Sequence, residues 1–162
     1  MEIEKKYRLS GFPEGLPLLR RSLQEQGYLA VRPAVRIRRE TDEKGVSYVL
    51  CIKGAGTLVR EEVEVSLTRE KFEKLEAMLC GPLIRKDYRV YALPDGHWLE
   101  CSQVDAGTEN SFYYAEVEFS SWEEAESFQA PNCVGEDITE KQGVSMSHFW
   151  QSTRVERGKF VL

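Results

Sequence analysis

Charged side chains recur at every second position at the start of the sequence, where Glu2, Glu4 and Lys6 follow one another in phase. Residues two apart on a β-strand share a face, so these two carboxylates and the ammonium group would point the same way. Neighbouring carboxylates repel each other unless a cation or a basic side chain relieves the repulsion. The stretch therefore indicates a charged strand face that needs a positively charged partner.

The same alternation returns along the chain, with basic as well as acidic residues. Arginine and lysine bind phosphate oxygens, arginine in a bidentate manner. Paired carboxylates suit Mg²⁺, which bridges them to substrate phosphates. A cavity lined by both kinds of residue would fit a complex of a polyphosphate with a metal ion. The residues in phase are Glu2, Glu4, Lys6, Arg36, Arg38, Lys53, Arg60, Glu62, Glu64, Arg85, Arg89, Glu116 and Glu118.

Length and composition predict one ordered globular domain over residues 1–162, with 41% hydrophobic and 30% charged residues. The net charge of −5 argues against a broadly basic surface for nucleic acid. The four cysteines form no C-x-x-C pair and have no histidine at zinc-ligand spacing, which argues against a zinc motif. The charged N-terminus and the lack of a long apolar run predict a cytoplasmic protein without a membrane partner.

Apolar residues at helical spacing predict helices over residues 14–26, 68–79 and 121–128, and a further helix around 144–151. Thr68 is placed as an N-cap, and Ser121 with Glu124 forms a capping box. Alternating segments predict antiparallel strands over 1–9, 28–31, 34–39, 46–53, 58–67, 83–93, 98–104 and 112–119.

Nearly every predicted strand has one charged face and one apolar face. Helices at 14–26, 68–79 and 121–128 could cover the apolar faces from outside, and the charged faces would then line a central, water-filled passage. The alternative is an ordinary solvated surface. We predict the first arrangement, an α+β fold in which an antiparallel β-barrel has helices packed outside.

Several segments resemble, in order, the motifs of the CYTH superfamily, the triphosphate tunnel metalloenzymes. Residues 2–6 match E-x-E-x-K, and residues 26–29 match Q-G-Y-L. Residues 35–38 resemble V-R-x-R, and residues 50–54 resemble L-T-x-K-G with Cys51 in place of threonine. Residues 60–64, 115–119 and 135–139 resemble R-x-E-x-E, A-E-V-E-[LF] and G-x-E-V-T.

The resemblance implies an eight-stranded antiparallel barrel whose lining residues bind a triphosphate and Mg²⁺ or Mn²⁺. It assigns carboxylates to the metal, basic residues to phosphate, and a catalytic role to Lys6, Arg60 and Glu64. Glu62 and Glu64 would orient the basic groups or bind a second metal. The implied metal ligands are Glu2, Glu4, Glu62, Glu64, Glu116 and Glu118, and the implied phosphate ligands are Lys6, Arg36, Arg38, Lys53, Arg60, Arg85 and Arg89.

Three positions depart from the motifs of the family. Asp87 stands at the arginine of K-x-R-Y, with Arg89 on the same face as a replacement. Ser102 stands at the aspartate of E-x-D, where Glu100 could compensate. Asp137 replaces a glutamate near the end of the chain and would be a shorter carboxylate in a similar role.

We therefore expect a metal-dependent hydrolase of a small-molecule triphosphate, foremost inorganic triphosphate. Within the family, an adenylate cyclase acting on ATP and a thiamine or nucleoside triphosphatase are the alternatives. A non-catalytic polyphosphate-binding module is an alternative of another class, which the changes at Asp87 and Ser102 make plausible. The sequence leaves a monomer and a homodimer equally open.

Overall fold

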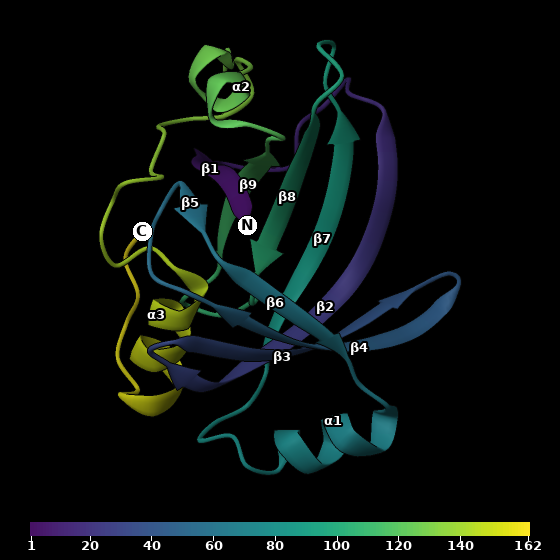
Figure 1. Ribbon diagram of the computed structural model, residues 1–162, viewed down its shortest axis with the longest axis vertical. Helices are drawn as coiled ribbons and strands as arrows, with labels where there is room; N and C mark the ends of the chain where they lie inside the picture. Colours follow the sequence, from purple (N-terminus) through teal and green to yellow (C-terminus); the bar gives the residue numbers. More distant parts are fainter.

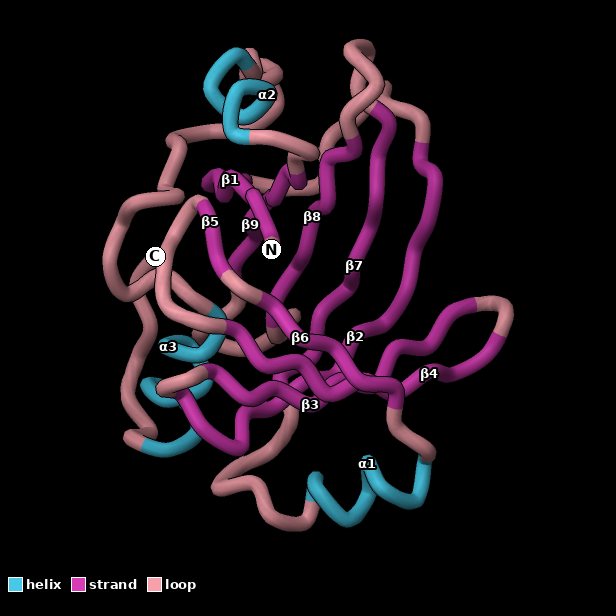
Figure 2. The backbone as a smooth tube through the Cα atoms, in the orientation of Figure 1, coloured by secondary structure: helices cyan, strands magenta, loops and turns pink.

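Nine strands form one antiparallel sheet in the computed structural model, which describes residues 1–162 (Figure 1). Their order in the sheet is β5-β1-β9-β8-β7-β2-β3-β4-β6. The smooth backbone trace shows the strands curving around a common centre (Figure 2). The strands are β1 (Glu2–Leu9), β2 (Leu18–Val31), β3 (Ala34–Asp42), β4 (Gly45–Lys53), β5 (Val59–Arg60), β6 (Glu62–Ser66), β7 (Ile84–Ala92), β8 (Trp98–Val104) and β9 (Phe112–Glu118).

The barrel closes through β5 and β6, which only Glu61 separates. β5 pairs with β1, with Arg60 opposite Glu2, and β6 pairs with β4, with Glu62 opposite Lys53. One continuous segment thus joins the two ends of the sheet. Counted as one strand, β5 and β6 correspond to the strand expected over 58–67, and the expected eight-stranded barrel is confirmed.

The helix predicted over residues 14–26 is wrong, because most of this segment belongs to the long strand β2. β2 pairs with β3 along one edge and with β7 along the other. Hydrogen bonds to these two strands satisfy the backbone amides and carbonyls of β2. This pairing stabilises a strand despite the weak helical pattern of the sequence. The leucines that suggested a helix do not form a buried helical face, since Leu18 and Leu19 are 52% and 49% exposed.

The other predicted helices are confirmed as short elements. Two of them lie outside the barrel wall (Figure 1), and the third contributes Met146 and Ser147 to the lining of the central cavity. They are α1 (Arg69–Glu76), α2 (Trp122–Ser127) and α3 (Met146–Trp150), which continues into the π-helical turn η1 (Gln151–Val155). The Thr68 hydroxyl accepts a hydrogen bond from the Lys71 amide, and the Ser121 hydroxyl accepts one from the Glu124 amide, as the capping patterns predict. None of these helices has the length and apolar composition needed to cross a bilayer.

Most of the apolar core lies between the barrel wall and its outer cover. Ile3, Val117 and Leu99 belong to the larger cluster, against which residues before β2 and around α2 pack. A second cluster joins Ile84 to Phe149 and Trp150 of α3. Because side chains alternate along a strand, an apolar outer face leaves the inward face for the charged residues.

Gly27 sits where the second cluster meets β2. An added Cβ there would lie 2.6 Å from Leu79 Cδ1 and 3.2 Å from Trp150 Cη2. We expect Gly27→Val to lower the free energy of unfolding by about 1–3 kcal/mol, because an extra branched side chain overpacks this contact. Chemical denaturation measures the loss. Gly11→Val is the matched control, since an added Cβ at Gly11 has nothing within 4 Å, and an equal loss in both variants would contradict the packing argument.

Candidate active site

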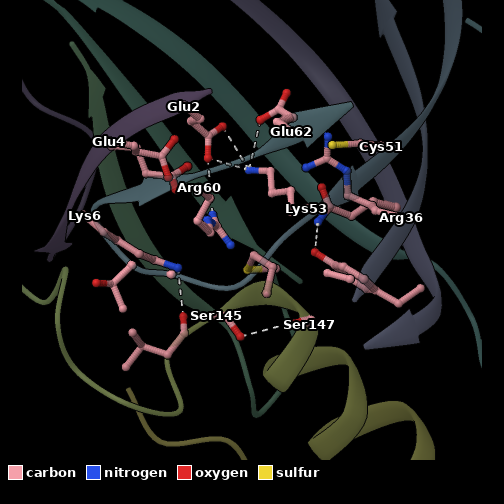
Figure 3. Close-up of a pocket in the computed structure, with 18 of the residues that line it drawn as sticks. Glu2, Glu4, Lys6, Arg36, Cys51, Lys53, Arg60, Glu62, Ser145 and Ser147 are labelled. Atoms are coloured by element: carbon pink, nitrogen blue, oxygen red, sulfur yellow. Dashed lines mark hydrogen bonds and ion pairs between the residues drawn. The ribbon is translucent and has the colours of Figure 1, made fainter. Parts of the chain in front are cut away.

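A cavity of about 760 Å³ fills the interior of the barrel and is lined mainly by charged and polar side chains (Figure 3). The inward faces of the strands bring together residues far apart in the sequence. Most of the residues singled out from the sequence line it: Glu2, Glu4, Lys6, Arg36, Arg38, Lys53, Arg60, Glu62, Glu64, Glu116 and Glu118.

Arg85 and Arg89 are the exceptions, and their expected role as phosphate ligands is corrected here. Both belong to the face of β7 that points away from the cavity, and neither lines it. The Arg89 guanidinium donates to Asp87, with Nη2 2.9 Å from Oδ2, and lies 3.7 Å above the Phe12 ring. Lys86 occupies the inward position instead. The alternation of residues in β7 correctly predicted a strand, but the face assigned to the cavity was the wrong one.

Sequence reasoning also missed polar residues on β2 and neighbouring strands. The inward residues of β2 were hidden by the helix assignment, although polar side chains at every second position were a signal for a strand. In β7 both faces carry polar groups, and the apolar neighbours Ile84 and Val90 made the inward face look like an outer one. The missed lining residues include Arg20, Gln24, Gln26, Tyr28, Glu40, Lys86, Tyr88 and Tyr114.

β1 and β9 build an acidic wall. Glu4 is the register partner of Glu118, and carboxylate oxygens of Glu2, Glu4 and Glu118 lie within 4.8 Å of one another. Burial and neighbouring carboxylates raise the pKa of Glu4 well above its usual value and also raise the pKa of Glu118. These three carboxylates offer only oxygen ligands and repel one another when no cation lies between them. Such a set fits a hard divalent cation such as Mg²⁺ or Mn²⁺.

Glu116 lies next to this cluster and behaves differently. Burial opposes its ionisation, but a hydrogen bond with Glu4 and the charges of Lys6, Lys53 and Lys86 lower its pKa to about 2. The same pair raises the pKa of Glu4. Burial and the neighbouring Glu116 thus favour the neutral form of Glu4, whereas the three lysines favour the charged form of Glu116.

β3, β4 and β5 supply the basic groups. Lys53 Nζ lies 3.1 Å from Glu2 Oε1 and 3.7 Å from Glu62 Oε2, and Arg60 Nη2 lies 3.4 Å from Glu2 Oε1. The Nε atoms of Arg36 and Arg60 are buried without a hydrogen-bond partner. Burial and the neighbouring Arg36 lower the pKa of Arg38. The basic groups thus hold unused donors and surplus positive charge, which suits an anion with several oxygens.

Two lysines approach the cavity from beside Tyr114. Lys6 Nζ donates to the Val144 carbonyl at 2.8 Å and lies 4.3 Å from the centre of the Tyr114 ring. Lys86 Nζ donates to the Tyr114 hydroxyl at 3.0 Å. Burial lowers the pKa of Lys86 to about 7, with Arg38 and Arg36 adding to the effect. A bound anion would favour the charged form of Lys86.

The departures from the family motifs have structural outcomes. Glu100 lines the cavity and accepts a hydrogen bond from the Tyr88 hydroxyl. Burial and the nearby Glu116 raise its pKa to about 7. Asp137 does not line the cavity; its Oδ1 accepts from the Thr139 amide at 2.9 Å. The expected role of Asp137 as a site carboxylate is therefore corrected to that of a residue that holds Thr139, which itself lines the cavity.

Comparison with curated proteins finds an inorganic triphosphatase from Nitrosomonas europaea. It is 34% identical over 143 residues, which are 86% of this chain and 89% of that protein. The chain belongs to the CYTH superfamily of triphosphate tunnel metalloenzymes. No family model matches the sequence.

Solved structures agree with membership of the triphosphate tunnel metalloenzymes. The crystal structure of the inorganic triphosphatase NE1496 has a TM-score of 0.66 and 27% identity, covering 94% of this chain and 95% of that chain. A Hippeastrum protein assigned as an adenylyl cyclase and found to have a dominant triphosphatase activity has a TM-score of 0.57 and 20% identity, covering 78% of this chain and 83% of that chain. At that identity, the second likeness concerns the fold alone.

The raised pKa values of the acidic wall predict how pH affects metal binding in the tunnel. Protons compete with a divalent cation for Glu4, Glu118 and Glu100, so metal affinity rises as pH rises through their pKa values. We expect Mg²⁺ to raise the Tm more at pH 8 than at pH 6. Thermal unfolding with and without MgCl₂ tests this, with NaCl of equal ionic strength as the control. A smaller rise at pH 8 would contradict the assignment.

Proposed function

We propose that this protein hydrolyses inorganic triphosphate in its tunnel, using Mg²⁺ or Mn²⁺, and releases orthophosphate. The observation that carries the proposal is the meeting of a carboxylate cluster and unpaired guanidinium donors in one cavity. A metal–triphosphate complex has complementary charge for both. The relative from Nitrosomonas europaea, an inorganic triphosphatase, supports the same substrate.

The acidic wall would hold the cation through Glu2, Glu4 and Glu118, with Glu116 beside them. A bound divalent ion neutralises phosphate charge and makes a water molecule more nucleophilic. Glu116 is suited to this place because its lowered pKa keeps it ionised at neutral pH. Glu62 and Glu64 lie among the basic groups, where they orient Lys53 and Arg36.

The basic groups would align the phosphate chain. Three strands separate β3 from β9 in the sheet order, so Arg36 and Arg38 approach the substrate from a different side than Glu116 does. Lys53 and Arg60 contact Glu2 and therefore lie between the carboxylates of the acidic wall and the arginines of β3. Phosphoryl transfer depends mainly on such alignment and charge neutralisation. In this arrangement Lys6 and Arg60 offset charge that develops on the phosphate oxygens, and Glu64 holds Arg36.

A panel of substrates tests the proposal directly. Release of orthophosphate from inorganic triphosphate with Mg²⁺ or Mn²⁺, faster than from ATP or thiamine triphosphate, is the expected result. Formation of cyclic AMP from ATP would instead indicate a cyclase. Tight binding without turnover would indicate a polyphosphate-binding module and would contradict the proposal.

Removing a metal-binding carboxylate should stop turnover without unfolding the barrel. We expect Glu4→Gln to lower kcat by about 100-fold or more, because the metal loses a charged ligand while the shape of the side chain is kept. Glu61→Gln is the matched control, since Glu61 is 81% exposed beside the tunnel strands. Phosphate release measures both variants, and near-normal turnover in Glu4→Gln would remove Glu4 from the metal site.

Lys86 and Arg89 test which face of β7 binds substrate. Lys86→Met should raise KM about tenfold or more, because a hydrogen bond from a charged group to phosphate contributes about 1.5–3 kcal/mol. Arg89→Met should leave KM unchanged, since Arg89 packs on Phe12 outside the cavity. Steady-state kinetics with inorganic triphosphate compares them. The reverse order of effects would restore the original assignment of Arg89.

Several expectations from the sequence remain predictions. We propose that residues 1–162 form one tunnel domain. We also propose that it is a cytoplasmic monomer or homodimer that binds neither nucleic acid nor membranes.

A further inference from the structure

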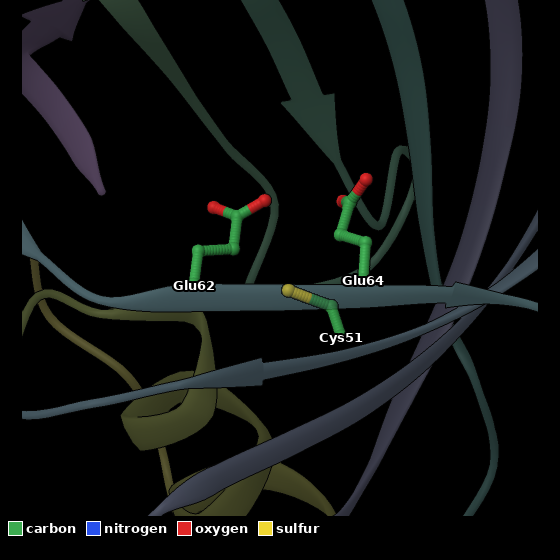
Figure 4. Close-up of side chains that lie close together, drawn as sticks. All are labelled: Cys51, Glu62 and Glu64. Carbon is green, nitrogen blue, oxygen red and sulfur yellow. The ribbon is translucent and has the colours of Figure 1, made fainter.

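Strand β6 has different chemistry on its two faces. Glu62 and Glu64 point toward the interior of the barrel, where Cys51 of β4 is the register partner of Glu64 (Figure 4). Because side chains alternate along a strand, Val63 and Val65 point outward. These valines are 58% and 51% exposed. The outer face of β6 is therefore apolar and in contact with water.

The apolar surface continues onto the neighbouring strand. Ile52 of β4 is the register partner of Val63, and Leu50 is the register partner of Val65. Ile52 is 38% exposed, and Leu50 is partly buried. Single exposed apolar residues are common on soluble proteins, but two adjacent cross-strand pairs form a contiguous surface of the kind that marks an interface. We call these four residues the outer patch.

Helix α1 covers the strand face beside the outer patch but not the patch itself. The next outward residue of β4 is Tyr48, whose ring centre lies 5.2 Å from that of Phe72 in α1. The helix packs on β3 and β4 and lies below them in the view of Figure 1. The valines of β6 stay exposed beyond the end of this cover. The outer patch therefore lacks the protection that α1 gives to Tyr48.

Charges of opposite sign bound the outer patch at its two ends. Glu61 directly precedes β6, and Arg69 is the first residue of α1. Each lies four residues from Val65, which is about 13 Å along an extended chain. The chain is still extended at Thr68, with φ −77° and ψ 159°. An acid and a base thus stand at nearly equal distances on either side of Val65.

Both end charges are available to a further partner. The Glu61 side chain is 81% exposed, and its Oε2 lies 3.9 Å from the N-terminal amine of Met1. The Arg69 side chain is 77% exposed and donates from Nε to Glu73 at 2.9 Å, which leaves both Nη atoms for another carboxylate. Exposed ion pairs of this kind contribute at most about 1 kcal/mol, so they do not hold either group in place.

We propose that the outer patch is the interface of a homodimer, in which a second copy of this chain packs face to face about a two-fold axis over Val65. A two-fold axis brings the same surface of both copies together. With the two β6 strands antiparallel, each Val65 meets its counterpart, and Glu61 of each copy lies against Arg69 of the other.

The arrangement of the charges favours a second copy over an unrelated partner. A surface with an apolar centre, an acid at one end and a base at the other is complementary to itself after a two-fold rotation. The two pairs of opposite charges also counter the repulsion between two chains that each carry a net charge of −5. Burial of the outer patch then supplies the attraction, since apolar surface leaves water.

Sedimentation equilibrium of the full chain tests the proposal. We expect the wild-type protein to approach twice the mass of one chain as its concentration rises. Val65→Lys should remain monomeric, because it places two ammonium groups together on the axis. Leu19→Lys is the matched control, since Leu19 is 49% exposed on β2, and this variant should still dimerise. A wild-type monomer at every concentration, or a dimer that persists in Val65→Lys, overturns the proposal.

Exchange of the end charges tests the orientation of the two copies. Glu61→Arg alone and Arg69→Glu alone should each weaken the dimer about tenfold or more, because each places like charges together twice. The variant that carries both changes should regain the wild-type affinity, since opposite charges meet again. Unchanged affinity in the single variants, or no recovery in the double variant, overturns the proposal.

Circular dichroism checks that each variant is folded. Should Val65→Lys fail to fold, the exchange of charges decides the question, because Glu61 and Arg69 are exposed side chains. Failure of the dimer would leave the proposed triphosphate hydrolysis untouched, since the tunnel residues lie on the opposite face of β6.

Discussion

Attraction between opposite charges inside the barrel is the interaction on which the rest of the structure depends. Lys53 contacts both Glu2 and Glu62, and Arg60 contacts Glu2. Buried charges are costly unless they are paired and hydrogen-bonded. The pairing here is incomplete. The Nε atoms of Arg36 and Arg60 are buried without a hydrogen-bond partner, and the pKa of Glu4 in the acidic wall is raised. The charged interior therefore suits a charged ligand better than it neutralises itself, and the incomplete pairing costs stability.

A charged interior determines where the apolar core can be. Each inward carboxylate or guanidinium is followed by an outward residue, and the outward residues of β1, β8 and β9 form the larger apolar cluster. The helices and the loops beside them then shield this outer layer from water. The strand interrupted at Glu61 closes the wall by pairing with β1 at one end and β4 at the other. Closure matters because an open edge would let water screen the charges of the cavity.

The sequence predicted the period of most strands better than it predicted their phase. Alternation placed Arg36 and Arg38 correctly, since Ile37 between them is fully buried outside the barrel. It failed in β7, where both faces carry charge and only the neighbours in space distinguish them. It failed in the first half of β2, because leucines at mixed spacing fit a helix as well as a strand. The resemblance to the family supplied roles for the residues, whereas the pairing of Cys51 with Glu64 required the register of β4 and β6.

The departure at Ser102 shows how such a cavity tolerates the loss of a carboxylate. Ser102 and Glu100 share a face of β8, and Glu100 is the register partner of Glu116. Glu100 is the other acid of the same motif, and it is kept on the face from which the acid at residue 102 is missing, about 6.6 Å along the strand. Tyr88 donates to Glu100 and holds its carboxylate within the cavity. The cavity therefore has one acid fewer than the motif would give it, while the carboxylates of Glu2, Glu4 and Glu118 still lie within 4.8 Å of one another.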